Sequence, residues 1–218
     1  MKKLYAIVFM AMLALTGKAF AEMSYGVSAA LTKIDASGTE TEGGEKTDGS
    51  ADNTVIIPSL FVEYAYSDTI SVGLDYIPLG ADVSSKTKKR QDTETSVTGT
   101  AASTTTARTQ QAQAELDNHI TLYAHYNMTD TMYLKVGAVR VDLNTDESLG
   151  TGSKYGNETL NGGLIGIGAQ SGNSRFEVVY TDYEDVSLTS SVARTGVTTN
   201  NKIEADLDTF AFKYSYAF

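Results

Sequence analysis

Apolar and polar residues alternate with a period of two along most of the chain. Polar stretches interrupt this alternation, and along the chain a long stretch always follows a short one and a short one follows a long one. Alternation of this kind is typical of strands with one apolar and one polar face. The pattern predicts eight strands, near residues 23–32, 55–66, 70–83, 116–128, 132–143, 160–170, 175–188 and 203–218.

The stretches between these strands fall into two groups. Three are tight, at residues 67–69, 129–131 and 171–174, and contain residues that bond their own backbone or tolerate a left-handed conformation. Four are long and polar, at about residues 33–54, 84–115, 144–159 and 189–202. Short periplasmic turns and long extracellular loops are typical of bacterial barrels. We therefore predict an all-β fold, a transmembrane eight-stranded antiparallel up-and-down β-barrel with three short periplasmic turns and four long extracellular loops.

The last strand gives the clearest assignment of faces. Aromatic residues share one parity, and Thr, Ala, Lys and Ser occupy the other. The lipid face of a barrel strand is apolar and the lumen face is polar. The residues expected to face lipid here are Phe210, Phe212, Tyr214, Tyr216 and Phe218.

Two features interrupt the alternation. In the fifth strand the parity fails around Arg140, and we predict a bulge there because an outward arginine near mid-membrane would cost about 2–4 kcal/mol. Pro58 and Pro78 lie ten residues on either side of Asp68, so they face each other across one hairpin. Because proline cannot donate to a ladder, this pair marks either the level where two strands leave the bilayer or a bulge at the rim.

The first 21 residues have the composition of a secretory signal peptide. Lys2 and Lys3 precede an apolar stretch at residues 4–15, and Ala19 and Ala21 form a small-residue cleavage site. The stretch is shorter than the roughly 20 apolar residues that span a bilayer. We therefore predict a cleaved signal peptide at residues 1–21, followed by an outer-membrane β-barrel domain at residues 22–218.

Net charge and cysteine content exclude some classes of binding partner and ligand. The whole chain carries a net charge of −10, and without residues 1–21 it has 14 basic and 27 acidic residues, a net charge of −13. So acidic a chain repels nucleic acid. The sequence contains no cysteine, which excludes disulfides and thiolate metal ligands, and nothing in it calls for a cofactor.

With its terminal aromatic residue, the pattern Phe210-x-Phe212-x-Tyr214-x-Tyr216-x-Phe218 resembles the assembly signal of outer-membrane barrels. Together with the three-turn, four-loop layout, the chain resembles the small eight-stranded class that includes outer membrane proteins A and X and the opacity proteins, without a periplasmic domain. The resemblance implies a location in the outer membrane of Gram-negative bacteria. It also implies contacts with outer-membrane lipids and lipopolysaccharide, delivery to the barrel assembly machinery through the last strand, and a monomeric state.

A group of ionisable residues shares the inward parity at about one depth, three to five residues from the periplasmic end of each strand. We call this group the polar layer: Glu63, Asp75, His125, Lys135, Glu177 and Lys213. His125 and Lys135 are expected to be cross-strand neighbours, with Gly73 and Gly137 leaving room beside the longer side chains. An eight-stranded barrel has an interior that side chains just fill. The layer is either a core of paired charges or a gate whose ion pairs exchange partners.

Other polar groups give weaker signals. The basic run Lys86, Lys88, Lys89 and Arg90 opens the second long loop and fits contacts with lipid phosphates, although a solvated loop segment fits it equally. Acidic residues of the first loop lack the spacing of a calcium loop, so we predict no metal site. The nearest match to a lipid-deacylating His-x-Ser arrangement is His119-Ile120-Thr121, on the inward parity, and we predict no catalytic residues.

Three functions remain in order of preference. The first is a non-enzymatic surface protein whose filled barrel anchors long polar loops for envelope integrity, adhesion or recognition. The second is a small porin-like channel for ions or tiny solutes, gated by the polar layer. The third, a lipid-modifying enzyme, rests only on analogy with other barrels.

Overall fold

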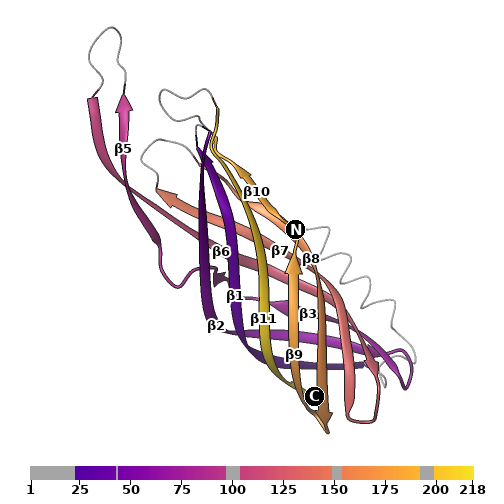
Figure 1. The fold of residues 1–218 in the computed structure, drawn as a ribbon. Helices are drawn as coiled ribbons and strands as arrows, with labels where there is room; N and C mark the ends of the chain where they lie inside the picture. Colours follow the sequence, from indigo (N-terminus) through magenta and orange to yellow (C-terminus); the bar gives the residue numbers. More distant parts are fainter. Residues whose placement is uncertain (1–22, 43, 97–103, 149–153, 192–198) are drawn as a thin grey trace, which may run out of the picture.

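The computed structural model describes residues 23–42, 44–96, 104–148, 154–191 and 199–218. The predicted signal peptide lies outside these residues. In the described part, eight antiparallel strands close into one ring (Figure 1). The ring contains β1 (Met23–Glu42), β2 (Glu45–Ala65), β3 (Ile70–Ile77), β6 (Thr104–Asn127), β7 (Met132–Ser148), β8 (Glu158–Ser171), β9 (Ser174–Tyr183) and β11 (Lys202–Ala217). Pairing of β1 with β11 closes the ring, which confirms the predicted fold class.

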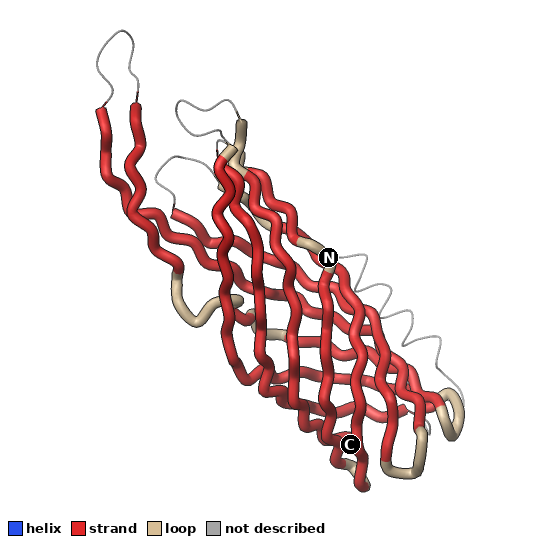
Figure 2. The backbone as a smooth tube through the Cα atoms, in the orientation of Figure 1, coloured by secondary structure: helices blue, strands red, loops and turns tan. Residues whose placement is uncertain are grey.

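Three shorter strands extend the ring at one end. The strands β4 (Ala81–Asp82) and β5 (Lys88–Ser96) pair with β6, and β10 (Val186–Thr189) pairs with β11. In Figure 2 the tight turns and the end of the last strand lie at the opposite end of the tube from these extensions. The three tight turns lie between β2 and β3, β6 and β7, and β8 and β9, as the sequence predicts. Gly172, with φ of 57°, takes the left-handed conformation in the last of them.

Much of what the sequence indicates as long loops is paired strand. The β1–β2 ladder continues to Glu42 opposite Glu45, and β1 follows β11 up to Thr41 opposite Lys202. The hairpin of β5 and β6 projects beyond the other strands (Figure 1). Apart from a few inward residues such as Ile34, Ala36 and Ala51, these segments are polar on both faces. The alternation that identifies the membrane-spanning strands is therefore weak in them. The predicted strands are therefore too short at the end opposite the tight turns.

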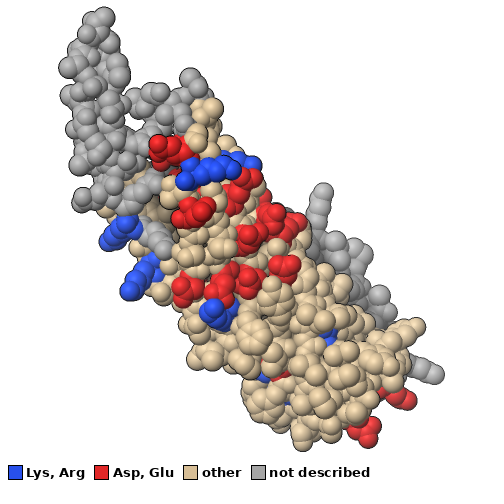
Figure 3. Space-filling view, viewed as in Figure 1, with Lys and Arg blue, Asp and Glu red and all other residues tan. Residues whose placement is uncertain are grey.

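The outward faces divide the barrel into two zones (Figure 3). In this view, a band of uncharged residues covers most of the half that carries the tight turns, and acidic side chains, with basic ones among them, gather on the other half. The band ends at Leu31, Ile56, Tyr180 and Phe210 on four consecutive strands. Because lipid tails exclude charge, the uncharged band is the membrane-spanning zone.

The predicted bulge at Arg140 is wrong. Alternation continues through β7, with Val139 and Val141 buried and Arg140 exposed. The register shift lies on the neighbouring strand, between Asp117 and Ile120, where Asn118 has φ of 52°. Arg140 can point outward because it lies at the upper end of the apolar band, beyond Ala138, and not in the middle of the membrane.

Pro58 and Pro78 mark a change in the barrel wall. The β2–β3 ladder stops at Leu60 opposite Tyr76, two residues before either proline. Contact between the two sides resumes higher up, where the Asn53 side chain donates to the Asp82 carbonyl at 2.7 Å. Neither proline can donate a ladder hydrogen bond, which explains why pairing ends here. The wall between these points has no strand pairing.

Candidate functional site

The polar layer crosses the lumen near the end of the barrel that carries the tight turns, and the structure brings all six of its predicted members together. It is built around two buried carboxylates, Glu63 on β2 and Glu177 on β9, with His125 between them. The inward parity of each strand places these side chains in the lumen, and similar distances from the tight turns place them at one level.

Glu63 is bound by three neighbours. Arg175 Nη1 and Nη2 donate to its two carboxylate oxygens at 2.8 and 2.9 Å, a bidentate pair. The hydroxyl of Tyr123 donates to Oε2 at 3.1 Å, and His125 Nδ1 lies 3.1 Å from the same oxygen. Both oxygens of the Glu63 carboxylate therefore have hydrogen-bonding partners.

Glu177 has an equivalent set of neighbours on the other side of His125. Lys135 Nζ lies 3.0 Å from both carboxylate oxygens, and the hydroxyl of Tyr133 donates to Oε1 at 3.1 Å. His125 Nε2 lies 3.2 Å from Oε1. Since His125 and Lys135 are cross-strand neighbours, as turn counting predicts, both reach the same carboxylate.

The third carboxylate, Asp75, pairs with Lys213. Ser59 also donates to Asp75 Oδ2 at 3.1 Å, and Ser28 and Ser59 hydroxyls are 2.7 Å apart. The layer thus contains three carboxylates and three cations within hydrogen-bonding distance. Such compensation is what buried charges require, because an unpaired buried charge costs several kcal/mol.

Aromatic rings fill the space around these charges. The His125 ring lies between Tyr123 and Tyr133, with centroid distances of 4.8 and 4.3 Å. A Cβ atom at Gly73 would lie 2.4 Å from Tyr123 Cζ, and one at Gly168 would lie 2.3 Å from Tyr133 Cζ. Both tyrosines therefore fit only because glycines lie beneath them.

Sequence reasoning missed three members of this network: Arg175, Tyr123 and Tyr133. Arg175 is the first residue of its predicted strand, directly after a tight turn, where facing is hardest to assign. Its parity is the same as that of Glu177, two residues later, and this is the signal that would have placed it inward.

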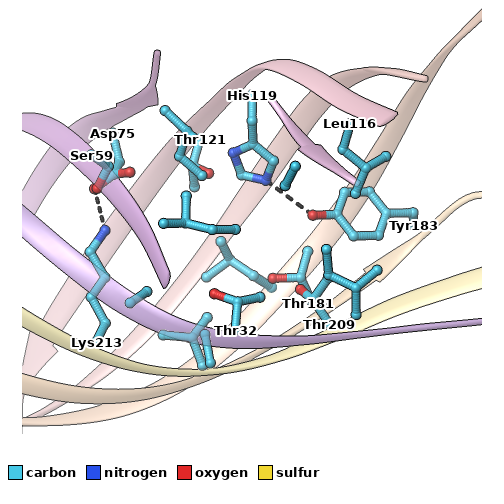
Figure 4. A pocket seen from close by; sticks show the side chains of 18 of the residues that line it. Thr32, Ser59, Asp75, Leu116, His119, Thr121, Thr181, Tyr183, Thr209 and Lys213 are labelled. Carbon is cyan, nitrogen blue, oxygen red and sulfur yellow. Dashed lines mark hydrogen bonds and ion pairs between the residues drawn. The ribbon is translucent and has the colours of Figure 1, made fainter. Parts of the chain in front are cut away.

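A cavity of about 90 Å³ lies above the polar layer (Figure 4). Lys135, Lys213 and Asp75 line its lower side. Threonines from four strands share its walls with apolar side chains: Thr32, Thr121, Thr181 and Thr209. Its lining is mostly apolar, unlike that of the layer beneath it.

His119 is the distinctive residue of this cavity. Its Nε2 lies 3.0 Å from the hydroxyl of Tyr183, and the two rings meet edge to face at 6.2 Å (Figure 4). Nδ1 of His119 is buried without a hydrogen-bond partner in the described part of the chain. Buried polar atoms rarely lack a hydrogen-bond partner, so His119 Nδ1 is an unusual feature of the cavity.

An apolar cluster closes the lumen above the cavity. Ile34, Leu116 and Tyr183 belong both to this cluster and to the cavity lining. Val141 and Leu160, also in the cluster, are completely buried. The lumen is therefore filled twice, by paired charges below the cavity and by packed apolar side chains above it.

The predicted lipid-contacting cations lie outside this site. Lys86 and Lys89 are exposed near β4 and β5, whereas the side chains of Lys88 and Arg90 lie outside what the structure describes. The five aromatic residues of the predicted assembly signal face outward: Phe210, Phe212, Tyr214, Tyr216 and Phe218. Their role in assembly stays a prediction.

Just above the apolar band, four aspartates lie side by side across four strands. Asp35 is the register partner of both Asp52 and Asp208, and Asp208 is also paired with Asp182. Partial burial and the nearby charges of Asp35 and Asp182 raise the pKa of Asp208. Lys33 Nζ, 2.7 Å from Asp35, offsets part of this repulsion.

Searches for other kinds of site among the described residues give two negative findings. No group of three or more His, Asp or Glu side chains there is placed to hold a metal ion. No helix in the same residues is long and apolar enough to cross a membrane.

Comparison with solved structures places the fold. The chain is similar to outer membrane protein AlkL, solved by solid-state NMR in lipid bilayers, with a TM-score of 0.51 and 15% identity over 90% of both chains. Weaker similarities include Ail, the attachment invasion locus protein of Yersinia pestis (TM-score 0.40, 11% identity, 88% of this chain and 99% of that one). Another is the outer membrane protease OmpT from Escherichia coli (0.43, 12%, 90% and 96%). No protein-family model and no curated protein sequence matches this chain.

At these identities the likeness shows the fold alone. The chain has the fold of a small eight-stranded β-barrel of the outer-membrane type.

Proposed function

We propose that this chain is a non-enzymatic surface protein whose filled barrel anchors extracellular strands for envelope integrity, adhesion or recognition. The observation that carries the proposal is the doubly filled lumen. Paired charges fill its periplasmic side and an apolar cluster fills its outer side. A barrel filled in this way serves as an anchor, and the part that reaches other molecules is the extension above the membrane.

The shape of that extension supports a surface role. β1, β2 and β11 stay paired beyond the apolar band, which gives a continuous sheet. Tyr155 adds to it, since its hydroxyl donates to Glu40 at 2.8 Å and its amide donates to Glu147 at 2.6 Å. Burial and the nearby carboxylate of Glu40 raise the pKa of Tyr155, so this hydroxyl remains a donor at physiological pH. The sheet presents polar, acidic side chains to the outside (Figure 3).

The proposal extends to partners. Lys86, Lys88, Lys89 and Arg90 would contact lipopolysaccharide phosphates beside the acidic surface. The outward aromatic row on β11 would be the segment that the barrel assembly machinery binds. We propose that the protein acts as a monomer, because the described strands close on themselves and, within the membrane-spanning zone, leave an unpaired edge only at the prolines.

The test compares cells that display the whole protein with cells that display a variant lacking residues 89–109 of the projecting hairpin. The control replaces the same residues with a shuffled sequence of identical composition. Heat-modifiable migration on gels confirms that each barrel is folded. We expect the deletion to reduce binding to host-cell or abiotic surfaces at least fivefold, or to increase detergent sensitivity of the envelope. Equal behaviour of cells with and without the whole protein in both assays would overturn the proposal.

A further inference from the structure

The cavity above the polar layer has a side that faces the membrane. Ile57, Ile77 and Leu79 line it where the β2–β3 ladder has ended. Leu79 lines the cavity and is also 59% exposed, so the cavity meets the outer surface of the barrel at this residue. Ile56, next to Ile57, points outward and is 74% exposed within the apolar band. The unpaired part of the wall therefore adjoins lipid.

The other directions are closed. Below, the pairs of Lys213 with Asp75 and of Lys135 with Glu177 occupy the lumen. Above, Ile34, Leu116 and Tyr183 pack within the apolar cluster. A molecule that reaches the cavity from the membrane passes between β2 and the segment that follows β3.

Inside the cavity, His119 offers one open hydrogen-bonding position. Its Nε2 is engaged by the Tyr183 hydroxyl, whereas Nδ1 is buried and has no partner among the described residues. Whichever tautomer the ring adopts, Nδ1 either donates or accepts one bond. A hydroxyl group suits both cases because it can donate and accept.

Size and lining define the rest of the ligand. A volume of about 90 Å³ is smaller than the roughly 150 Å³ of an apolar cavity that binds benzene, so it suits a hydroxyl and a few carbon atoms. The wall residues Ile57, Ile77 and Leu79 are apolar and would contact a longer chain that continues outward. The lining provides no free charge for an ionic head group, since Lys135, Lys213 and Asp75 are already paired.

We propose that the cavity binds a neutral single-chain amphiphile of the aliphatic alcohol class, taken from the outer leaflet through the unpaired wall. Its hydroxyl bonds to His119 Nδ1, and its chain lies against Ile57, Ile77 and Leu79 and extends into the lipid. The surface role does not require this site, and the site does not require the extracellular strands.

The test uses a medium-chain alkanol with a photoreactive diazirine close to the hydroxyl, added to refolded protein in phosphatidylcholine nanodiscs. After irradiation, mass spectrometry locates the labelled residues. We expect saturable labelling on cavity residues near His119 and Thr121, suppressed by excess 1-octanol. His119→Leu is expected to raise the half-saturating alkanol concentration at least fivefold, whereas His119→Gln retains part of the affinity.

A matched pair of variants separates the cavity from the lipid-facing surface. Ala30 lines the cavity, and Ala29, its neighbour on β1, faces lipid. Ala30→Phe is expected to reduce cavity labelling at least tenfold, and Ala29→Phe to leave it unchanged, with gel migration verifying folding of both. If Ala30→Phe fails to fold, Ala211→Phe, which fills the cavity from β11, replaces it. Labelling that is spread over outward residues and is insensitive to these changes would overturn the proposal.

The route is tested separately. The chain has no cysteine, so Pro58→Cys combined with Pro78→Cys allows β2 to be joined to the segment after β3 by a disulfide that mass spectrometry verifies. We expect the oxidised protein to label at least fivefold more slowly and reduction to restore the rate. Equal rates in both redox states would contradict entry from the membrane, and competition by alkanol supplied only in water would then identify the aqueous source.

Discussion

At the scale of single residues, position decides what each charge does. Glu63 and Glu177 are buried and have cations, tyrosines and His125 around them, whereas Glu204 lies on the surface and pairs with Lys202 at 2.7 Å. Parity in the sequence could place the six predicted members of the polar layer. It could not give their partners, because which carboxylate meets which cation depends on strand tilt and side-chain packing across the lumen. Arg175 is the instructive case, since it pairs with Glu63 from the opposite side of the barrel.

Removing one carboxylate from the layer leaves its cation buried without compensation. We expect Glu177→Ala to lower the free energy of unfolding by about 3–5 kcal/mol, because Lys135 loses its only ion-pair partner in the described residues. Urea titration in lipid vesicles, followed by the gel shift, measures this change. Glu204→Ala removes an exposed pair and serves as the control, with no measurable change expected. Equal stabilities of the two variants would show that the layer does not hold the barrel together.

The row of aspartates above the membrane has the opposite effect on stability. The pKa of Asp208 is raised in the folded protein, so its charged form disfavours folding, and this penalty grows as the pH rises through the folded pKa. We therefore expect Asp208→Asn to raise the urea midpoint at pH 7 in low salt and to lose this advantage at acidic pH. Asp130→Asn, at the tight turn between β6 and β7, is the control for a change in net charge. A destabilised Asp208→Asn variant at pH 7 would contradict the repulsion across these strands.

At the scale of elements, the sequence predicts the strands whose outward face contacts lipid. It does not predict their continuation above the membrane, where the outward face contacts water. The alternation gives every membrane-spanning strand and all three tight turns. It fails for residues 33–42 and 45–54, which are paired strands with mostly polar residues on both faces and only a few apolar inward ones such as Ile34. It also fails at Arg140, because the sequence does not show where along a strand the bilayer ends.

The projecting hairpin gives a test of the orientation of the barrel. In the described part of the chain β5 pairs only with β6, and an isolated two-stranded ribbon is marginally stable in water. We expect trypsin added to intact cells to cleave after Lys88, Lys89, Arg90 or Arg108, leaving fragments that stay together as a heat-modifiable barrel. Arg175, which pairs with Glu63 inside the barrel, is the internal control and is expected to resist. Cleavage only in permeabilised cells would place the hairpin on the wrong side of the membrane.

At the scale of the whole molecule, three zones follow one another along the barrel axis. A layer of paired charges lies near the end with the tight turns, a small cavity lies above it, and an apolar cluster closes the other end of the lumen. This order explains why an interior rich in charge need not conduct ions. The polar layer could be predicted from the sequence, but the cavity could not. A cavity depends on whether side chains from facing strands reach one another, and the sequence does not show this.

The closed lumen is tested most directly by planar-bilayer recording of refolded protein that lacks residues 1–21, with the gel shift verifying that the barrel is folded. Paired charges below the cavity and packed side chains above it lead us to expect no conductance steps above background. Glu177→Ala and Lys135→Ala are recorded in parallel, because each breaks one pair in the layer. Reproducible small steps in the unaltered protein that these two substitutions change would contradict the closed barrel and would make the polar layer the gate of a channel.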